Sequence, residues 1–198
     1  FHEAQSKYPE LKMILGMECE YQDHYYGFYK DELLGEYGVK YLVLGQHFFK
    51  YNGEWVYLWK KPQGIDELKI YTDALLRGMA SGLFEFVAHP DMFAYFYEPW
   101  DNEAKACSRA ILEAAADLIL PIEINGYGFR KGKVAYETVT RYKYPLRQFW
   151  ELASQYDIKI LVNSDAHKPE DVGSVEKAQE LAKDLGLKFA DLSHLEDL

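Results

Sequence analysis

The sequence is poor in cysteine, lacks any long apolar run and carries no excess of positive charge, and each absence excludes a class of protein. Its two cysteines, Cys19 and Cys107, have neither zinc-finger nor Cys-x-x-Cys spacing, so we expect buried free thiols in a reducing compartment. No apolar run is long enough to span a membrane and no secretory leader opens the chain, which predicts a cytoplasmic protein without a membrane partner. The formal net charge of −10 disfavours a nucleic-acid partner.

What the sequence does contain is a series of apolar segments that end in polar side chains. These segments are residues 13–18, 41–47, 84–91, 121–125 and 158–167, and they end in or near Glu18, His47, His89, Asn125, Asp165 and His167. Because the carboxyl ends of parallel strands meet at one rim of a sheet or barrel, we expect these groups to converge on a metal site. The pattern predicts a metal-dependent hydrolase.

Amphipathic segments separate the predicted strands, and this alternation predicts an α/β fold with parallel pairing and right-handed crossovers. Helices are predicted over residues 66–83, 102–118, 145–154 and 170–185. Asp101 or Asn102 is the expected N-cap of the second helix, and Gly186 is expected to end the fourth. Residues 188–192 are the candidate for a sixth strand. The aromatic and polar segments 23–40 and 49–64 are expected to be loops that line a site.

Five or six strands are too few for a closed (β/α) barrel of eight strands, which typically needs about 250 residues. We therefore expect residues 1–198 to form a single domain that lacks one or two N-terminal βα units. A smaller open α/β sheet is the alternative.

The polar groups at the predicted strand ends are of types that bind divalent ions. Glu18 has two oxygens that can bridge two cations, while His47 and His89 each offer a neutral imidazole nitrogen. Asp165 and His167 are two residues apart, so in an extended segment both side chains face the same side. Each residue also has a competing role: a lysine ion pair for Glu18, a turn for His47, a buried hydrogen bond for His89, a helix N-cap for Asp165 and the surface for His167. Imidazole and carboxylate without thiolate suit Zn²⁺, Mn²⁺ or Fe²⁺.

Together these segments resemble the PHP (polymerase and histidinol phosphatase) superfamily, and within it the histidinol-phosphatase branch. The resemblance runs from about residue 11 to about residue 173, and the motif at 163–173 is its most specific part. The matching motifs are Leu15-Gly-Met-Glu18 with Glu20-Tyr21, Leu44-Gly-Gln-His47-Phe48, Ala88-His-Pro-Asp91, Glu123-Ile-Asn125, Gly128-Phe-Arg-Lys131, Tyr144-Pro145 and Asn163-Ser-Asp-Ala-His-Lys-Pro-Glu-Asp-Val-Gly173.

The resemblance implies a distorted (β/α)7 TIM-like barrel, N-terminally incomplete in this chain, with a two- or three-metal centre on its C-terminal face. The implied metal ligands are Glu18 as the bridging carboxylate, His47, His89, Asp165 and His167, the last on a third ion. Of these, Glu18, Asp165 and His167 are implied to be catalytic, and Asn125 is implied to lie beside the ligands.

Arg130 resembles the arginine that grips the substrate phosphate in this family, and a solvated charge run with Lys131 and Lys133 is the alternative. The chain departs from the family in one respect: the family opens with a His-x-His pair on its first strand, and nothing before Glu18 matches it. Five ligands remain, whereas three metals at about four ligands each need about a dozen coordinating atoms. We expect either that this motif is missing from the chain or that the chain binds one or two ions.

The expected function is hydrolysis of L-histidinol phosphate to L-histidinol and phosphate in histidine biosynthesis, a substrate that the branch resemblance implies. No serine or cysteine nucleophile elbow occurs, so we expect direct attack by water, with Asp91 or a histidine protonating the leaving group. The alternatives are another PHP phosphoesterase, acting on phosphotyrosine, a sugar phosphate or a nucleotide, and a non-catalytic fragment that keeps the fold. The expected partner is a small phosphorylated molecule, and the sequence leaves the oligomeric state open.

Overall fold

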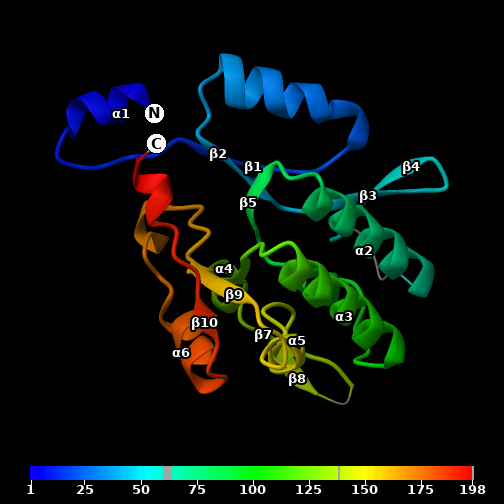
Figure 1. Cartoon of the computed structure of the whole chain (residues 1–198). Helices are drawn as coiled ribbons and strands as arrows, with labels where there is room; N and C mark the ends of the chain where they lie inside the picture. Colours follow the sequence, from blue (N-terminus) through cyan, green and yellow to red (C-terminus); the bar gives the residue numbers. More distant parts are fainter. Residues whose placement is uncertain (60–63, 138, 198) are drawn as a thin grey trace.

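A six-stranded parallel sheet forms the centre of the molecule in the computed structural model, which describes residues 1–59, 64–137 and 139–197 (Figure 1). Its order is β1 (Gly16–Cys19), β2 (Tyr41–Leu44), β5 (Phe84–Val87), β6 (Ile122–Asn125), β9 (Lys159–Asn163) and β10 (Lys188–Phe189). Every neighbouring pair in this order is parallel. The five predicted strands and the candidate sixth strand are therefore all present.

The sheet is open in the described residues, so the α/β fold with parallel strands is confirmed, whereas the distorted (β/α)7 barrel implied by the resemblance is not seen as a closed barrel. β1 and β10 each have one neighbouring strand, and the two do not pair with each other. A barrel closes only when every strand has a neighbour on both sides. β10 is two residues long and the outer edge of β1 is unpaired in the described part of the chain, so the described residues form an open parallel sheet.

Helices connect the strands and cover the sheet. The longer ones are α2 (Ile65–Ala80), α3 (Asn102–Asp117), α5 (Arg147–Ala153) and α6 (Glu176–Asp184), and the short ones are α1 (His2–Lys7) and α4 (Gly126–Arg130). α2 and α3 pack side by side (Figure 1). Asp101 caps α3 as predicted, because its side chain accepts a hydrogen bond from the Ala104 N–H at 3.0 Å. Gly186 follows α6 with a φ of 63°, also as predicted.

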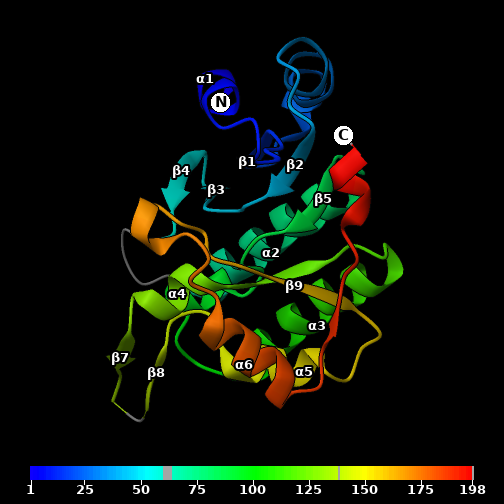
Figure 2. The same cartoon turned by 90° about the vertical axis from the view of Figure 1, so that its left-hand side faces the viewer.

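The helix predicted over 170–185 starts late, because Pro169–Asp171 form a separate 3₁₀ turn, η4, before α6 begins at Glu176. Three more 3₁₀ turns occur in the described chain: η1 (Asp23–Tyr25), η3 (Met92–Tyr95) and η5 (Ser193–Asp197). An antiparallel hairpin that the sequence analysis does not predict, β7 (Lys133–Ala135) with β8 (Thr140–Tyr142), projects away from the sheet (Figure 2).

The two segments expected to be loops contain regular structure. Phe28–Glu36 forms a π-helical segment, η2, and β3 (Phe48–Tyr51) pairs with β4 (Glu54–Tyr57) in an antiparallel hairpin. Asn52 and Gly53 at the hairpin turn have φ of 49° and 85°, which is the conformation that an Asn-Gly pair adopts in two-residue hairpins. This signal is present in the sequence. The end of the second predicted loop, residues 60–63, lies outside the described residues.

The main hydrophobic core joins α2, α3 and α5 to one face of the sheet, and most of the aromatic side chains contribute to it rather than to a surface. Trp150 and Tyr71 are its largest fully buried side chains. The buried Asp91 ties the segment after β5 to α5, because its Oδ2 accepts hydrogen bonds from Trp150 Nε1 at 3.0 Å and from the Leu146 N–H. Burial raises the pKa of Asp91 to about 7. Asp91 thus faces α5 rather than the strand-end groups.

Both cysteines are free thiols, as predicted, but only Cys107 on α3 is buried as expected, whereas Cys19 at the end of β1 is half-buried. Within residues 1–59, 64–137 and 139–197, no helix combines the length and the apolar character that a membrane span requires.

Candidate metal centre

Glu18, His47 and His89 come together at the carboxyl ends of the first three strands of the sheet. Glu18 lies in β1, His47 follows β2 and His89 follows β5, so the parallel order of the sheet brings the three side chains to one rim. The Nε2 atoms of His89 and His47 lie 3.2 Å and 3.6 Å from the same oxygen, Glu18 Oε1. One donor atom from each residue falls within 4.8 Å of the other two.

This spacing fits a divalent ion. Donor atoms about 2.0–2.1 Å from a tetrahedral zinc ion lie about 3.3–3.4 Å from one another, close to the two distances between Glu18 and the histidines. Burial raises the pKa of the Glu18 carboxyl, but the hydrogen bond from His89 and the nearby histidine charges lower it more, so the net shift is downward. Glu18 is therefore available as an ionised ligand at neutral pH. The donor set of two imidazoles and a carboxylate agrees with the Zn²⁺, Mn²⁺ or Fe²⁺ predicted from the sequence.

Glu20 fixes the orientation of His47. Its Oε1 lies 2.8 Å from His47 Nδ1, and its carboxylate accepts the backbone N–H groups of His47 at 2.9 Å and Phe48 at 3.2 Å. The ring of His47 also stacks on Trp59 with 5.4 Å between ring centroids. Because Nδ1 is held by a carboxylate, Nε2 is left facing Glu18, an arrangement that metal-bound histidines commonly show. Burial lowers the pKa of His47, but Glu20 and the other acids nearby outweigh it and raise the pKa.

Replacing Glu20 with alanine is expected to weaken zinc binding by about 10–100-fold without removing a ligand, since loss of an orienting carboxylate usually has an effect of this size. Competition with a fluorescent zinc chelator measures the affinity. Glu113→Ala serves as the control, because this exposed acid lies on α3 outside the cluster. Equal zinc affinity of the Glu20 variant and the unmodified protein would contradict the orienting role.

A line of hydrogen bonds leads from His89 to Asp165. The backbone N–H of His89 donates to Glu123 Oε2 at 2.9 Å. The side-chain amide of Asn125 donates to Glu123 Oε2 at 3.3 Å and to Asp165 Oδ2 at 3.0 Å. Asn125 Oδ1 accepts the Gly128 N–H at 2.9 Å and thereby caps α4. Burial raises the pKa of Glu123 to about 8, so this carboxyl is mostly protonated at neutral pH. Asn125 thus lies beside the ligands, as predicted, and positions Asp165.

The backbone at Asp165 and His167 differs from the predicted extended segment, although the two side chains lie together. β9 ends at Asn163, and Asp165 has a φ of 46°, so the segment is turned rather than extended. His167 Nδ1 lies 3.5 Å from Asp165 Oδ1 and 3.0 Å from the Asp165 carbonyl oxygen, and the His167 ring stacks on Tyr127 at 4.4 Å. The structure therefore gathers three of the five predicted ligands into one cluster. Asp165 is connected to it through Asn125, and ligand roles for Asp165 and His167 stay predictions.

Arg130 points its guanidinium at the turn that carries Asp165. Its Nη2 donates to the Asp165 carbonyl at 3.1 Å, its Nη1 donates to the Ser174 carbonyl at 3.3 Å, and its Nε lies 3.3 Å from Asp171 Oδ1. Both terminal nitrogens of the guanidinium thus donate to backbone oxygens, while Nε is within ion-pair distance of Asp171 but forms no hydrogen bond in the described residues. The predicted contact of Arg130 with a substrate phosphate stays a prediction.

A cavity of about 440 Å³ opens beside the cluster. It is lined by His47, Phe48, Tyr57, Trp59, Tyr127, Lys131 and His167. Two of the predicted ligands are in this wall, together with four aromatic rings and one cation. A small molecule in this cavity would therefore lie against both the metal ligands and an aromatic surface.

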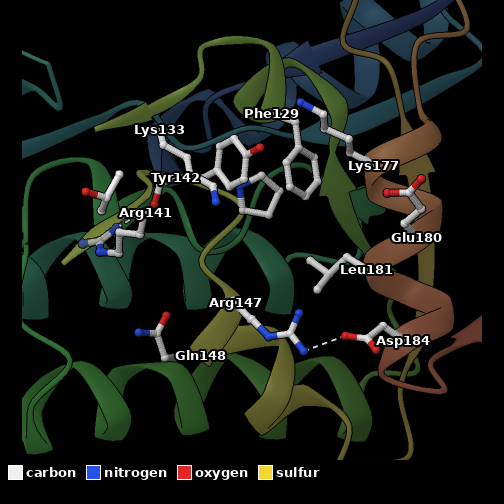
Figure 3. Close-up of a pocket in the computed structure, with 12 residues that line it drawn as sticks. Phe129, Lys133, Arg141, Tyr142, Arg147, Gln148, Lys177, Glu180, Leu181 and Asp184 are labelled. Carbon is white, nitrogen blue, oxygen red and sulfur yellow. Dashed lines mark hydrogen bonds and ion pairs between the residues drawn. The ribbon is translucent and has the colours of Figure 1, made fainter. Parts of the chain in front are cut away.

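A larger pocket of about 630 Å³ lies elsewhere, between the β7–β8 hairpin, α5 and α6 (Figure 3). None of the predicted site residues lines it. Arg147 and Asp184 form an ion pair at 2.6 Å across one side, while Phe129, Tyr142 and Leu181 supply apolar surface (Figure 3). Its size alone does not make it the functional site, because the candidate metal ligands are absent from it.

A parallel α/β sheet with a Glu–His–His cluster at its carboxyl rim defines an α/β protein with a candidate centre for divalent metal ions. Residues 143–178 match the family model described as PHP-associated. This segment includes the predicted Asp165 and His167, and no curated protein sequence matches the chain.

Two solved structures share the fold. One is hisK from Listeria monocytogenes, a candidate histidinol phosphatase, with a TM-score of 0.67, 21% identity, and coverage of 89% of this chain and 72% of that one. The other is the histidinol phosphate phosphatase of Lactococcus lactis subsp. lactis Il1403 in complex with zinc, L-histidinol and phosphate. It has a TM-score of 0.68, 16% identity, and coverage of 98% of this chain and 75% of that one. At these identities the likeness establishes the fold. Together with the PHP-associated segment, it confirms the resemblance to the PHP superfamily that the motifs predicted.

Proposed function

We propose that this protein is a metal-dependent phosphomonoester hydrolase and that its substrate is L-histidinol phosphate. The observation that carries the proposal is the cluster of Glu18, His47 and His89 beside a cavity of about 440 Å³. The Lactococcus lactis protein of the same fold was solved with zinc, L-histidinol and phosphate, which supports both the metal and the substrate class. The reaction is histidine-biosynthetic, and the two free thiols support a cytoplasmic location.

The proposed centre contains two or three divalent ions. Glu18, His47 and His89 hold the first, and Asp165 and His167 supply ligands for the others. When bound, such ions lower the pKa of a coordinated water towards about 7 and withdraw negative charge from the phosphoryl oxygens.

The remaining residues orient these ligands and exclude solvent. Glu20 holds the His47 ring, Asn125 holds Asp165, and Arg130 holds the turn on which Asp165 lies. Trp59 and Tyr127 stack on the two histidines that line the cavity and restrict the water that can reach them. No side chain of this chain has to act as a nucleophile, because water attacks the phosphorus directly.

Residues 1–198 are proposed to be a single PHP-type domain that lacks the first βα unit or units of the distorted (β/α)7 barrel. The outer edge of β1, unpaired within the described residues, supports this, because in the barrel another strand would pair there. Glu18 is on β1, so an additional strand paired with β1 would also bring further ligands close to the cluster.

Phosphate release tests the proposal. The purified protein is loaded with Zn²⁺ or Mn²⁺ and assayed with malachite green on L-histidinol phosphate, phosphotyrosine, glucose 6-phosphate and AMP. We expect metal-dependent release, with kcat/KM for L-histidinol phosphate at least about tenfold above the others. Comparable rates on all four would contradict the substrate. No release from any, with less than one tightly held ion per chain, would favour the non-catalytic fragment, an alternative supported by the gathering of only three of five predicted ligands.

A further inference from the structure

Lys131, immediately after α4, places its ammonium group among aromatic rings. Its Nζ lies 4.4 Å from the ring centroid of Tyr127, 5.2 Å from Tyr144, 5.3 Å from Trp59 and 5.5 Å from Tyr95. It also donates a hydrogen bond to the Tyr144 hydroxyl at 3.0 Å. Ring faces attract a cation and limit where it can move, so the position of this ammonium is well defined.

The ammonium of Lys131 has no carboxylate partner within ion-pair distance in the described part of the chain. A second cation is close instead: Lys143 Nζ lies 3.8 Å from the centroid of Tyr95, the ring that Lys131 also faces. Burial lowers the pKa of both lysines; for Lys131 the charge of Asp165 opposes this shift and the charge of Lys143 adds to it. In a protein with 32 acidic and 22 basic side chains, two neighbouring cations, with Asp165 close to Lys131 but not in ion-pair contact with it, form a local site for an anion.

This ammonium belongs to the candidate site. Lys131 lines the same cavity as His47 and His167, whereas Arg130, its neighbour in sequence, is held by two carbonyl oxygens and Asp171. One Lys131 N–H is used by Tyr144, and two donors are left for another acceptor. A phosphoryl group in the cavity would supply oxygens for these donors and a negative charge beside the Lys131 ammonium.

We propose that Lys131, rather than Arg130, holds the phosphoryl group of the substrate in this cavity. Lys131 is then a substrate-binding residue, kept in place by the ring of aromatic side chains. Arg130 is a positioning residue that keeps the Asp165 turn in place. The proposal rests on the proposed phosphatase function, since it names the residue that binds the anionic part of the same substrate.

The experiment compares Lys131→Met with Arg130→Met in the metal-loaded protein, using L-histidinol phosphate as substrate and inorganic phosphate as a competitive inhibitor. Lys131→Met is expected to raise KM and the inhibition constant of phosphate by the same factor, about 10–100-fold, with unchanged metal content and an unchanged unfolding midpoint. Lys131→Arg, which keeps the charge, should restore part of the phosphate affinity. Arg130→Met is expected to lower kcat with little change in the inhibition constant.

Lys133→Met is the matched control, because Lys133 is two residues away but lines the other pocket (Figure 3). It should leave both constants unchanged. An unchanged phosphate inhibition constant in Lys131→Met, with an increase in Arg130→Met, would overturn the proposal in favour of Arg130.

Failure of the proposed function can be told apart from failure of this proposal. If the unmodified protein releases no phosphate from any substrate, the function is wrong, and inorganic phosphate binding is then followed by ³¹P NMR titration of the metal-loaded protein. Binding that is lost in Lys131→Met but kept in Lys133→Met supports the anion site. Absence of phosphate binding in the unmodified protein, or binding unaffected by Lys131→Met, overturns it.

Discussion

Replacing Glu18 with glutamine is expected to strip the tightly bound metal from the protein and to slow phosphate release by at least about 100-fold, the scale on which loss of one electrostatic stabiliser slows an enzyme. Glu18 Oε1 is the atom that both His47 and His89 face, at 3.6 Å and 3.2 Å. Glutamine keeps the size of the side chain but removes the negative charge that a divalent ion requires. Two neutral imidazoles alone would then hold the first ion.

Elemental analysis of metal content after dialysis, together with the malachite-green assay, measures both effects of Glu18→Gln. Glu113→Gln makes the same chemical change on the exposed side of α3 and should keep both metal and turnover. A Glu18→Gln protein that retains one ion per chain and full activity would show that the cluster is not the metal centre.

The second large effect is expected on stability: Trp150→Ala should lower the free energy of unfolding by about 3–5 kcal/mol, the usual cost of truncating a buried tryptophan. Trp150 is fully buried on α5, packs edge-on against Phe149 at 5.2 Å and donates its Nε1 hydrogen to Asp91. Removing the indole leaves a cavity and also takes a hydrogen bond from a buried carboxyl. Typical domains are stable by about 5–15 kcal/mol, so this loss is a large fraction of the total.

Urea unfolding followed by circular dichroism measures the effect of Trp150→Ala. Trp55→Ala is the control, because Trp55 on β4 is 50% exposed and its removal should change stability by less than about 1 kcal/mol. Trp150→Phe fills most of the cavity and isolates the loss of the Asp91 hydrogen bond. Equal unfolding midpoints for the Trp150→Ala and Trp55→Ala proteins would mean that α5 is not part of the cooperative core.

Much of the fold and three of the ligands could be predicted because they depend on local patterns. Apolar runs ending in Glu18, His47 and His89 define strands whose carboxyl ends must meet in a parallel sheet, whatever the loops do. Caps such as Asp101 and Gly186 were also predictable, because capping is decided within one helical turn.

The arrangement around Asp165 could not be predicted in the same way. Asp165 has a positive φ and is held by distant parts of the chain: Asn125 donates to its carboxylate and Arg130 donates to its carbonyl oxygen. Sequence spacing alone places Asp165 and His167 on one side of a strand that in fact ends at Asn163. Whether the sheet closes into a barrel could not be predicted from local patterns either, because closure requires a second neighbouring strand for each of the two outer strands.

Sequence resemblance also could not decide whether Arg130 or Lys131 faces the cavity. The two side chains are adjacent and both basic, yet one faces backbone carbonyls and the other faces the cavity. This difference arises because the chain leaves α4 at Lys131 and because Trp59 and Tyr144, far apart in sequence, meet around its ammonium. The Asn-Gly turn at 52–53 differs from these cases, because an Asn-Gly pair is by itself a local sequence signal for a hairpin, although the sequence analysis predicts a loop there.

The outer edge of β1, which is unpaired in the described part of the chain, affects which molecules can approach the candidate centre. Backbone amides and carbonyls along that margin offer a template to any extended peptide, as exposed strand margins generally do. An extended segment paired with that edge would run beside Glu18, whose side chain is 37% exposed, so whatever covers this edge would also cover one side of the candidate centre.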